Sequence, residues 1–526
     1  MSDVDVVISG AGPNGLMLAC ELALAGVTPV VLDALPGPSD EPKANGLVGQ
    51  VVRLLDMRGL YTPITGLADP PRPVQGWIFS GMALDLVGID DNPMYAMAIS
   101  QPKLVRFLAE RARELGIDVR WGHELTALDT SDDGVRLTIA TESGVYTATA
   151  SYLVGADGGR SFVRKSVGID FPGATSPTVA RVAHVSVPEE YLHSDGGLDV
   201  PGFGRVSFGH NRFDRGMVIY APFEPDRTLL GTMEFGPAAQ ADEPMSLGEL
   251  RDSLARVLGT EIRVDEPHGP GPHALRRING QNTRQAERYR SGRVLLVGDA
   301  AHVHSAMGGP GLNLGLQDVV NVGWKLAAVV NGTAPDALLD TYQTERHPVG
   351  ERVMMHSMSQ IALMAPGPEI AQLRKLFTEL IAIPQAAAHM AGLLAGSDVR
   401  YDMGDDHPLS GYLVGDLTLD DGRRVAELLH KARPVLLDLG GGAAARWARS
   451  WADRVDTVDA ELAGGPVAVL IRPDGYVAWA ADEFGAADEQ RLHEALSRWF
   501  GEPGAGVTAD PGGRTWPGTS TGRRLR

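Results

Sequence analysis

The sequence predicts an α/β protein with a doubly wound parallel sheet, an inserted antiparallel sheet and a smaller α/β domain after them. Three observations carry this prediction. The chain opens on a strand–helix–strand unit, because VDVVIS (4–9) and TPVVLD (28–33) flank an apolar helical pattern. Alternating apolar and polar residues, typical of antiparallel strands, recur between residues 176 and 275 in RVAHVSV, GRVSFGH and GMVIYAPF. The apolar strands PVLLDL and VAVLIRP follow beyond residue 406.

A chain of 526 residues is too long for one compact core and suggests about three domains. We predict a discontinuous dinucleotide-binding domain with a helical extension, formed by residues 1–72, 98–175 and 276–400. Residues 73–97, with the alternating segment QGWIFSGMALDLV, and 176–275 are predicted to form the inserted substrate-binding β-sheet domain. Residues 406–500 form the third domain, and the tail 501–526, rich in Gly, Pro, Thr and Arg, is predicted to be disordered.

The remaining elements follow from local patterns. A helix is predicted over Pro102–Leu115, and strands over Asp118–Trp121, Val135–Ala140 and 293–298 (RVLLVG). Residues 340–400 are predicted to be mostly helical. In the third domain a turn at Asp474-Gly475 precedes a helix over Glu489–Phe500.

Composition excludes several classes of protein. Hydrophobic residues at 44% and charged residues at 21% fit a globular domain, and no run approaches the roughly 20 apolar residues of a membrane span. Acidic residues stand where a signal peptide needs basic ones, so a cytoplasmic location is expected. The net charge of −19 argues against nucleic acid or an anionic membrane as a partner. Cys20 is the only cysteine, and its apolar helical surroundings predict a core position.

The first motif is Gly10-Ala11-Gly12-Pro13-Asn14-Gly15, followed by Asp33 at the end of the second strand. Gly10 permits a tight turn, Gly12 lets a pyrophosphate approach the backbone, and Gly15 lets helix and strand pack closely. The helix N-terminus attracts the phosphate charge, and Asp33 accepts hydrogen bonds from a ribose. The unit predicts dinucleotide binding but does not distinguish FAD from NAD.

Two further motifs follow strands. In YLVGADGGRSFVR (152–164) a strand runs into the turn at Asp157, an arrangement that in isolation also fits an ordinary strand-to-helix turn. In GDAAHVHSAMGGPGLNLG (298–315) a strand delivers Asp299 to a glycine-rich loop. A metal is not expected there, because Asp299, His302 and His304 lack an evident further donor. His302 is predicted to stabilise the loop by hydrogen bonding, while His304 fits a structural or a substrate-side role equally.

In this order and at these separations, the three motifs resemble the FAD fingerprint, DG and GD motifs of the group A flavoprotein aromatic hydroxylases, over residues 1 to about 400. The segment VLIRPDGYVAWA (469–480) resembles the thioredoxin-like C-terminal domain of the phenol-hydroxylase and polyketide-hydroxylase branch, which extends the resemblance to about residue 500. The expected fold is therefore that of para-hydroxybenzoate hydroxylase with a thioredoxin-like domain added.

The resemblance implies FAD as the cofactor. Asp299 would hold the ribityl and pyrophosphate region, and the loop Gly308-Gly309-Pro310-Gly311 would lie under the pyrimidine edge of the flavin. The helix starting near Leu312 would direct its N–H groups at flavin N1 and O2. The residues implied to bind FAD are Gly10, Gly12, Pro13, Asn14, Gly15, Asp33, Lys43, Gln101, Asp157, Asp299, Gly309, Gly311, Leu312 and Asn313.

This sequence departs from the family pattern at three positions. Lys43 and Gln50 stand where relatives often have arginine, and Ala306 stands where they usually have proline beside the isoalloxazine. Lysine keeps the charge but loses the planar fork of arginine. Gln50 loses the charge as well, and the loop at Ala306 would be less rigid. Gln101 matches a family glutamine near the pyrophosphate, and Arg106 is placed on the phosphate side of the same helix.

The resemblance also implies the reaction. NADPH, less often NADH, would reduce FAD near Arg160 and Arg164 without a nucleotide-binding domain of its own. O₂ would then form a flavin C4a-hydroperoxide that hydroxylates an electron-rich ring. No protein group is assigned as catalytic, and the loop Ala306, Gly308, Gly309 and Pro310 is the candidate beside the reacting atoms. Candidates for contact with the aromatic substrate, in this branch often a polycyclic polyketide, are Trp77, Phe79, Tyr95, Phe208, Met217 and Tyr220.

Two other functions stay open on the sequence. On the same fold, a Baeyer–Villiger oxygenase would insert oxygen beside a carbonyl. From another class, a flavin-bound resistance protein would sequester an aromatic drug without turnover. The third domain has no cysteine and is therefore expected to be structural, covering its apolar strands by packing on the flavin domain or on another subunit of a homo-oligomer.

Overall fold

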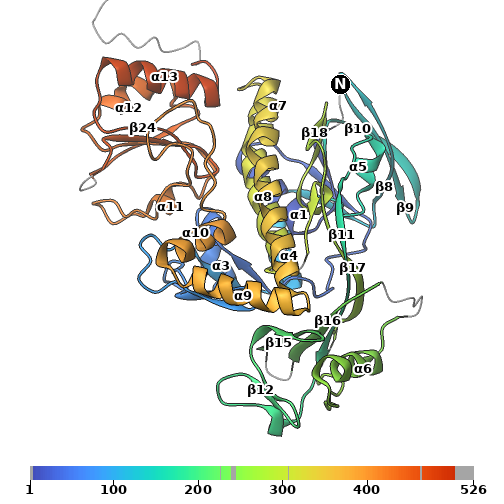
Figure 1. Cartoon of the computed structure of the whole chain (residues 1–526). Coiled ribbons are helices and arrows are strands. Elements are labelled where there is room, and N and C mark those ends of the chain that lie inside the picture. The colour runs from blue at the N-terminus through green and yellow to red at the C-terminus, as the bar shows by residue number, and fades with distance from the viewer. Residues whose placement is uncertain are drawn as a thin grey trace, which may run out of the picture. The chain divides into compact units, whose positions relative to one another are not determined.

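The computed structural model describes residues 4–224, 227–237, 244–269, 271–305, 307–461 and 465–503 (Figure 1). The chain divides into two compact units, one of Met1–Arg400 with His430–Ala432 and one of Tyr401–Leu429 with Arg433–Arg526. Within the described ranges, no helix is long and apolar enough to cross a membrane.

A mostly parallel sheet forms the centre of the first unit. Its strand order is β18-β19-β10-β1-β2-β7, and β10 continues through β9 to β8. The strands are β1 (Val4–Ser9), β2 (Val30–Asp33), β7 (Asp118–Trp121), β8 (Glu124–Ser131), β9 (Gly134–Thr141), β10 (Gly144–Gly155), β18 (Arg290–Ser291) and β19 (Val294–Leu296). The inner strands are continuous apolar runs because helices cover the sheet. These helices include α1 (Pro13–Leu24), α4 (Gln101–Glu114) and α7 (Pro310–Val330).

The register of this sheet brings three strand ends together. In the parallel ladder Ser9 of β1 lies beside Gly155 of β10, and Gly155 lies beside Leu296 of β19. The chain continues from these ends into Gly10, Asp157 and Asp299, respectively. All three motifs of the sequence therefore meet at one edge of the sheet, although they are far apart along the chain.

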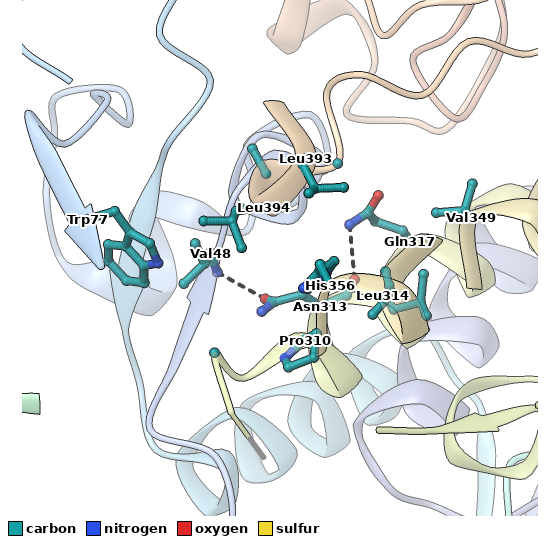
Figure 2. Close-up of a pocket in the computed structure, with 14 residues that line it drawn as sticks. Val48, Trp77, Pro310, Asn313, Leu314, Gln317, Val349, His356, Leu393 and Leu394 are labelled. Atoms are coloured by element: carbon teal, nitrogen blue, oxygen red, sulfur yellow. Dashed lines mark hydrogen bonds between the residues drawn. The ribbon is translucent and has the colours of Figure 1, made fainter. Parts of the chain in front are cut away.

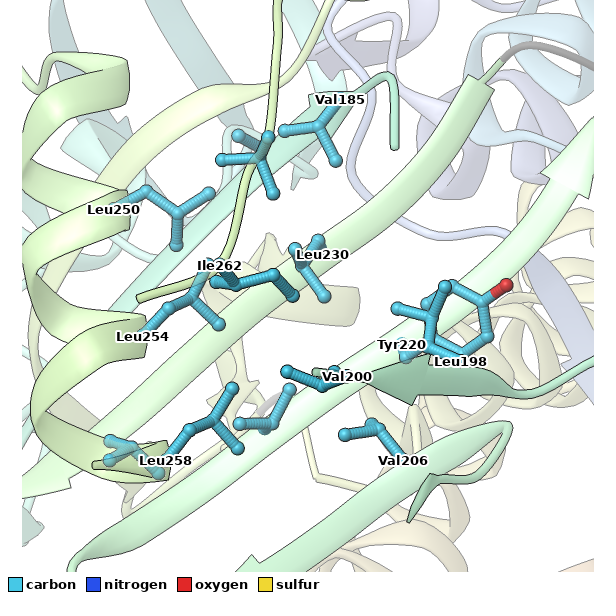
Figure 3. Packing of buried hydrophobic residues seen from close by; sticks show 14 of the residues in the cluster. Val185, Leu198, Val200, Val206, Tyr220, Leu230, Leu250, Leu254, Leu258 and Ile262 are labelled. Carbon is cyan, nitrogen blue, oxygen red and sulfur yellow. The ribbon is translucent and has the colours of Figure 1, made fainter. Parts of the chain in front are cut away.

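A six-stranded sheet in the order β14-β15-β16-β11-β17-β20 forms the second layer of this unit. Its strands are β11 (Gly173–Val185), β14 (Gly209–Phe213), β15 (Gly216–Glu224), β16 (Arg227–Phe235), β17 (Leu275–Gln285) and β20 (His302–Val303). Helix α6 (Leu247–Leu258) covers one face, where Leu250 and Leu254 belong to one apolar cluster with Tyr220 and Leu230 (Figure 3). The opposite face carries Met217, which packs in a cluster with Met307 of the glycine-rich loop.

Two details of the inserted sheet differ from the sequence prediction. Strand β17 extends to Gln285, past the predicted return at residue 275. Strands β4 (Gly76–Phe79) and β5 (Met82–Asp85) form a hairpin of their own rather than joining the six-stranded sheet. The hairpin packs against α9 (Pro368–Ile381) and α10 (Pro384–Ala395) instead. Alternating patterns show that one face of a strand is buried, but they do not show which element covers it.

The remaining elements of this unit are short, apart from the long helix α8 (Asp340–Met364) beside α7. They are β3 (Gly46–Val48), α2 (Gln50–Asp56), α3 (Tyr61–Thr65), β6 (Ala96–Ala98), α5 (Phe162–Ser166), β12 (Leu198–Val200), β13 (Gly204–Val206) and the 3-10 turns η1 (Glu189–Tyr191), η2 (Gly298–Ala300) and η3 (Asp336–Leu339).

The second unit has a four-stranded sheet in the order β22-β21-β23-β24. Its elements are α11 (Val425–Leu428), β21 (Val435–Asp438), α12 (Ala443–Trp447), η4 (Ala448–Trp451), β22 (Asp456–Asp459), β23 (Ala468–Ile471), β24 (Val477–Ala481) and α13 (Ala486–Phe500). Strands β21 and β22 are parallel, and the other neighbours are antiparallel. This is the arrangement of a thioredoxin-like domain. The predicted disordered tail lies, from residue 504 onward, outside the described residues.

We predict that the single thiol is inert in the folded protein. Cys20 is 2% exposed, and burial, assisted by the charge of Glu21, raises its pKa to about 12. Iodoacetamide at pH 8 should leave the native protein unlabelled and modify Cys20 only after unfolding, which mass spectrometry measures. Cys20→Ser should cost about 1–3 kcal/mol of unfolding free energy because a hydroxyl is buried there. Labelling of the native protein at the rate of a free thiol would contradict this prediction.

Candidate cofactor and active site

The glycines of the first motif are required by close backbone approaches. Gly10 has φ +110°, and a Cβ on it would lie 2.4 Å from the carbonyl oxygen of Ala156. A Cβ on Gly15 would lie 1.9 Å from the carbonyl oxygen of Gly10. By contrast, no atom of the described residues lies within 4 Å of a Cβ built on Gly12, the N-cap of α1. The turn is therefore tight behind α1 and open in front of its N-terminus, where a phosphate would bind.

Asp33 is fixed to this turn. Its Oδ2 accepts a hydrogen bond from the backbone N–H of Ala11 at 2.7 Å, and its Oδ1 accepts one from Leu35 at 2.8 Å. A carboxylate oxygen has a second lone pair, so both oxygens can still accept from a ribose hydroxyl. The acid thus connects the second strand to the turn and stands where a ribose is expected.

The second motif places an incompletely satisfied carboxylate at the same edge. Asp157 Oδ2 accepts from the backbone N–H of Val163 at 3.0 Å. Its Oδ1 is enclosed and has no hydrogen-bond partner among the described residues. An enclosed carboxylate oxygen without a donor is costly, which points to a ligand or water that supplies one.

Arg164 has a different role from the one that the sequence suggests. Its guanidinium donates to the carbonyl oxygens of Ala300 (2.8 Å) and Gly159 (3.0 Å) and lies 3.7 Å over the ring of Phe171. The residue is 4% exposed, and this burial lowers its pKa. Arg164 therefore ties the second motif to the third and does not lie at an entrance. Arg160 is exposed and stays a candidate there.

The third motif presents Asp299 to solvent at the same edge. Its carboxylate is accessible on one side, while the protein atoms around it raise its pKa by desolvation, against the effects of His302 and Lys43. Lys43 also pairs with Glu41 at 3.0 Å. A Cβ on Gly311, at the start of α7, would lie 3.9 Å from Asp299 Oδ1. Asp299 thus lies beside the first turn of α7 and is accessible to solvent.

His302 anchors the loop that carries Asp299. Its Nε2 lies 2.5 Å from Asp318 Oδ2, and Arg346 Nε lies 2.7 Å from Asp318 Oδ1. All three side chains are inaccessible to solvent. This buried ion-pair network links the loop to α7 and α8, so His302 has the loop-stabilising role expected from the sequence.

His304 lies behind this network. Its ring stacks on His302 with centroids 5.2 Å apart, and burial lowers its pKa well below the usual value. Both ring nitrogens are enclosed without a partner among the described side chains. No group of three His, Cys, Asp or Glu residues in the described part of the chain could hold a metal ion.

The glycine-rich loop is held open by a long-range contact. Gly308 and Gly309 have φ values of +78° and +65° in the left-handed region. Asn313 Nδ2 donates to the carbonyl oxygen of Gly309 at 2.8 Å, and Asn313 Oδ1 accepts from the backbone N–H of Val48 at 2.9 Å. A Cβ on Gly309 would meet no described atom within 4 Å, so a flat ring can lie against this backbone. Ala306 lies outside the described residues.

A mainly apolar cavity adjoins this loop (Figure 2). Its polar members are Asn313, Gln317 and His356, and Trp77 stands at its far side. Burial lowers the pKa of His356 to about 4, so its imidazole is neutral at ordinary pH. The cavity is lined by Val48, Trp77, Gly308, Pro310, Asn313, Leu314, Gln317, Val349, Val353, His356, Leu393, Leu394, Ala395 and Gly396.

The predicted substrate contacts divide by location. Trp77 lines the cavity, and Met217 faces the loop through Met307. Phe79 is buried and stacked on Phe377, and Tyr95 is buried with Arg53 over its ring. Phe208 is 59% exposed and lines a separate cavity.

Tyr220 is the clearest correction among these contacts, because it lies on the α6 face of its strand, away from the loop. Adjacent residues of a strand point to opposite faces, so Tyr220 cannot share the loop-facing side with Ile219.

The other predicted cofactor residues lie on the first strand–helix unit and on α4. Asn14 packs between Gly298 and Gly315, where added Cβ atoms would lie 2.0 Å and 2.5 Å from its amide nitrogen. Gln101 begins α4, and its backbone N–H donates to Ala44. Arg106 pairs with exposed Asp40, and Gln50 is buried and accepts from Arg53. Sequence reasoning missed Val48 and Gln360, which contact the loop from distant segments without any local pattern.

The fold and this edge define a flavin dinucleotide-binding protein. The open N-terminus of α1 and the bare backbone at Gly309 fit a pyrophosphate and a flat ring, respectively. A family model for the FAD binding domain matches residues 3–357, and one for the C-terminal domain of aromatic-ring hydroxylases matches residues 407–503. The chain belongs to the family of FAD-binding aromatic-ring hydroxylases.

Relatives extend over nearly the whole chain. The 12-dehydrotetracycline 5-monooxygenase/anhydrotetracycline 6-monooxygenase of Streptomyces rimosus is 42% identical over 95% of this chain and 99% of its own. The structure of the anhydrotetracycline hydroxylase OxyS from Streptomyces rimosus matches with a TM-score of 0.84 at 41% identity, over 95% of this chain and all of the other. The aromatic hydroxylase CabE from angucycline biosynthesis matches with a TM-score of 0.82 at 37% identity, with the same coverage.

These findings confirm the predictions that the three motifs and the C-terminal segment carried. The protein is an FAD-dependent aromatic hydroxylase with a mixed α/β FAD-binding domain, an antiparallel sheet and an aromatic-ring-hydroxylase C-terminal domain.

Proposed function

We propose that the protein hydroxylates a polycyclic aromatic polyketide, with NADPH as electron donor and O₂ as the source of oxygen. The observation that carries this proposal is the mainly apolar cavity that begins at the glycine-rich loop and has Trp77 at its far side. The apolar lining of this cavity suits contact with the apolar edge of a flat substrate of several rings. The tetracycline and angucycline hydroxylases among the relatives support the same substrate class.

The protein's own contribution is binding, orientation and exclusion of water. When bound, FAD supplies electron transfer and oxygen activation. The turn at Gly12, Asp33 and Asp299 would hold its phosphates, ribose and ribityl chain. The α7 N-terminus would stabilise negative charge at the pyrimidine edge. Asn313 fixes the loop so that this geometry exists before the substrate arrives.

The contact between the glycine-rich loop and the six-stranded sheet is rich in methionine. Met217, Met233, Met307 and Met364 cluster with Ile361 on the loop-facing side of the six-stranded sheet. Methionine adapts its shape and makes favourable sulfur–aromatic contacts. These side chains would enclose the reacting ring and keep water away from it.

A labelled-oxygen experiment tests the function. The holoenzyme is incubated with NADPH, ¹⁸O₂ and a panel of tetracyclic and angucyclinone substrates, and the products are analysed by mass spectrometry. Hydroxylation predicts NADPH oxidation that rises with substrate and a phenolic product carrying one labelled oxygen. A lactone or ester with labelled ring oxygen would establish the Baeyer–Villiger alternative. Tight binding without NADPH oxidation or product would establish a sequestering protein.

We predict that Arg160→Gln weakens the use of NADPH. Arg160 is exposed beside the second motif, whereas its neighbour Arg164 is held in the interior. Loss of one charge-assisted contact should raise the KM for NADPH about tenfold while FAD content stays unchanged. Steady-state kinetics measure this, with Arg113→Gln on the exposed surface of α4 as the matched control. An equal KM in both variants would remove Arg160 from the NADPH site.

A further inference from the structure

A second, polar cavity lies in the first unit, away from the cofactor edge. It is formed by the edge strand β14, the turn between β4 and β5, and helix α9, and its lining residues are Ile78, Gly81, Ser207, Phe208, His210, Asn211, Arg212, Phe213 and Arg374. In the β14–β15 ladder His210 lies opposite Ile219, and Arg212 lies opposite Met217. Paired residues share a face, so His210 and Arg212 belong to the loop-facing side of the sheet.

Two arginines converge in this cavity on the end of helix α8. Arg212 Nε and Nη2 donate to the carbonyl oxygen of Ala365 at 3.0 and 2.8 Å. Arg374 Nη1 donates to the carbonyl oxygens of Ser80 (2.7 Å) and Leu363 (3.0 Å). The partial negative charge of a helix C-terminus explains why the arginines are held there. This partial charge does not neutralise the two full positive charges of the arginines.

The pair has no carboxylate counter-ion among the described residues, unlike several more deeply buried arginines of the same unit. Arg58, Arg181 and Arg346 of the same unit each pair with a glutamate or aspartate. No carboxylate in the described ranges lies within ion-pair distance of Arg212 or Arg374. Desolvation, followed by the nearby charge of Arg212, lowers the pKa of Arg374. Arg212 Nη1 and Arg374 Nη2 remain donors without a protein partner among the described residues.

The rest of the lining suits an aromatic body. Phe208, which is 59% exposed, stands with Phe213 and Ile78 around the arginines. A Cβ on Gly81 would lie 3.7 Å from Met364, a member of the methionine cluster that includes Met307. The methionine cluster therefore reaches the turn at Gly81, which lines this cavity.

We propose that this cavity, which we call the arginine pocket, binds an anionic oxygen group of the aromatic substrate, a carboxylate or an enolate. The proposal rests on the proposed function, because it takes the ligand to be the substrate whose ring lies at the loop. Planar guanidinium groups bind a pair of acidic oxygens in fixed geometry, and such contacts orient a ligand as well as hold it. The pocket would thus select substrates with an acidic group at the end distant from the oxidised ring.

The network behind Arg374 gives the pocket a contact with the loop. Ser80 Oγ donates to the carbonyl oxygen of Gln360, and Ser80 N–H donates to its side-chain oxygen. A Cβ on Gly308 would lie 2.9 Å from Gln360 Nε2. Two side chains therefore connect Arg374 to the glycine-rich loop, so a ligand in the pocket should perturb the flavin absorption spectrum.

Binding of two matched probes to the oxidised holoenzyme tests the proposal. Anthraquinone-2-carboxylate carries the acidic group, and 2-(hydroxymethyl)anthraquinone is its neutral counterpart. Titrations followed by flavin absorbance give each Kd without turnover. The wild-type protein should bind the carboxylate about tenfold more tightly than the alcohol. Arg212→Gln and Arg374→Gln should each remove this preference and leave the Kd of the alcohol nearly unchanged. If Arg212→Gln folds poorly, Arg212→Lys provides the test, and this variant should retain part of the preference for the carboxylate.

Controls separate this pocket from other sources of anion binding. Lys375→Gln removes an exposed charge from the same helix and should leave the preference intact. The Kd for NADP⁺ should be the same in wild type, Arg212→Gln and Arg374→Gln. Equal binding of both probes by the wild type, equal losses in Lys375→Gln, or loss of NADP⁺ affinity in the arginine variants would each overturn the proposal. Because the assay needs no hydroxylation, its result is independent of whether a polyketide is turned over.

Discussion

Replacing Asp318 with alanine is expected to destabilise the protein by about 3–5 kcal/mol, the largest effect on stability that we predict. Asp318 is inaccessible to solvent and receives His302 on one carboxylate oxygen and Arg346 on the other. Without it, Arg346 loses a buried carboxylate partner, and its charge cannot regain its hydration. Urea denaturation followed by tryptophan fluorescence measures the loss.

A surface pair provides the matched control for this prediction. Asp199 also accepts an arginine, Arg205, but its side chain is 55% exposed. Asp199→Ala should therefore cost less than about 1 kcal/mol, because water replaces the lost contact. Similar losses of unfolding free energy in the two variants would show that the buried network does not contribute the predicted stability. The Asp318→Ala substitution should also remove the hydrogen-bond partner of His302. The loop that carries Asp299 should then be less firmly anchored.

Replacing Asp299 with alanine is expected to weaken FAD binding about tenfold to a hundredfold, which corresponds to roughly 1.5–3 kcal/mol. The carboxylate stands at the end of β19, opposite the N-terminus of α7, where the ribityl chain is expected. Its removal deletes a charged acceptor without opening the fold, since the side chain is accessible to solvent. Equilibrium dialysis of reconstituted apoprotein measures the FAD affinity.

Asp129→Ala is the control for Asp299→Ala. Asp129 is an exposed acid on β8, at the far end of the same sheet, and its loss should leave the Kd for FAD unchanged. If Asp299→Ala kept wild-type FAD affinity, the third motif would have a purely structural role. Chromatography of the released chromophore should give FAD rather than FMN, because Asp33 and the open turn at Gly12 accommodate the adenosine half.

The cofactor motifs could be predicted because each is local. Gly10, Gly15 and Asp33 lie within one strand–helix–strand unit, and the backbone approaches that exclude a Cβ arise between neighbouring turns of chain. Parallel pairing then follows from the apolar strands themselves, since buried parallel strands read as continuous hydrophobic runs. The sequence alone therefore contains the information that places the three motifs at one edge of the sheet.

The substrate side could not be predicted in the same way. The alternation that identified β15 does not say which of Met217 and Tyr220 faces the loop, and α6 settles it by covering Tyr220. The hairpin at Trp77 has the pattern of the inserted sheet, yet its partners are helices far along the chain. A basic residue such as Arg164 is expected at a cofactor entrance, but its guanidinium is held in the interior by hydrogen bonds to two backbone carbonyl groups.

The sequence by itself determined the fold class, FAD as the cofactor and the family, because these depend on short spacings of glycine, aspartate and apolar residues. Only the tertiary structure decided how the loop is fixed by Asn313 and Val48, which residues form the cavity beside it, and where Arg212 and Arg374 meet. The physical reason is that a local pattern sets which side of an element is buried. The element that covers this side is determined by contacts between segments hundreds of residues apart. The periodicity of the sequence does not show these contacts.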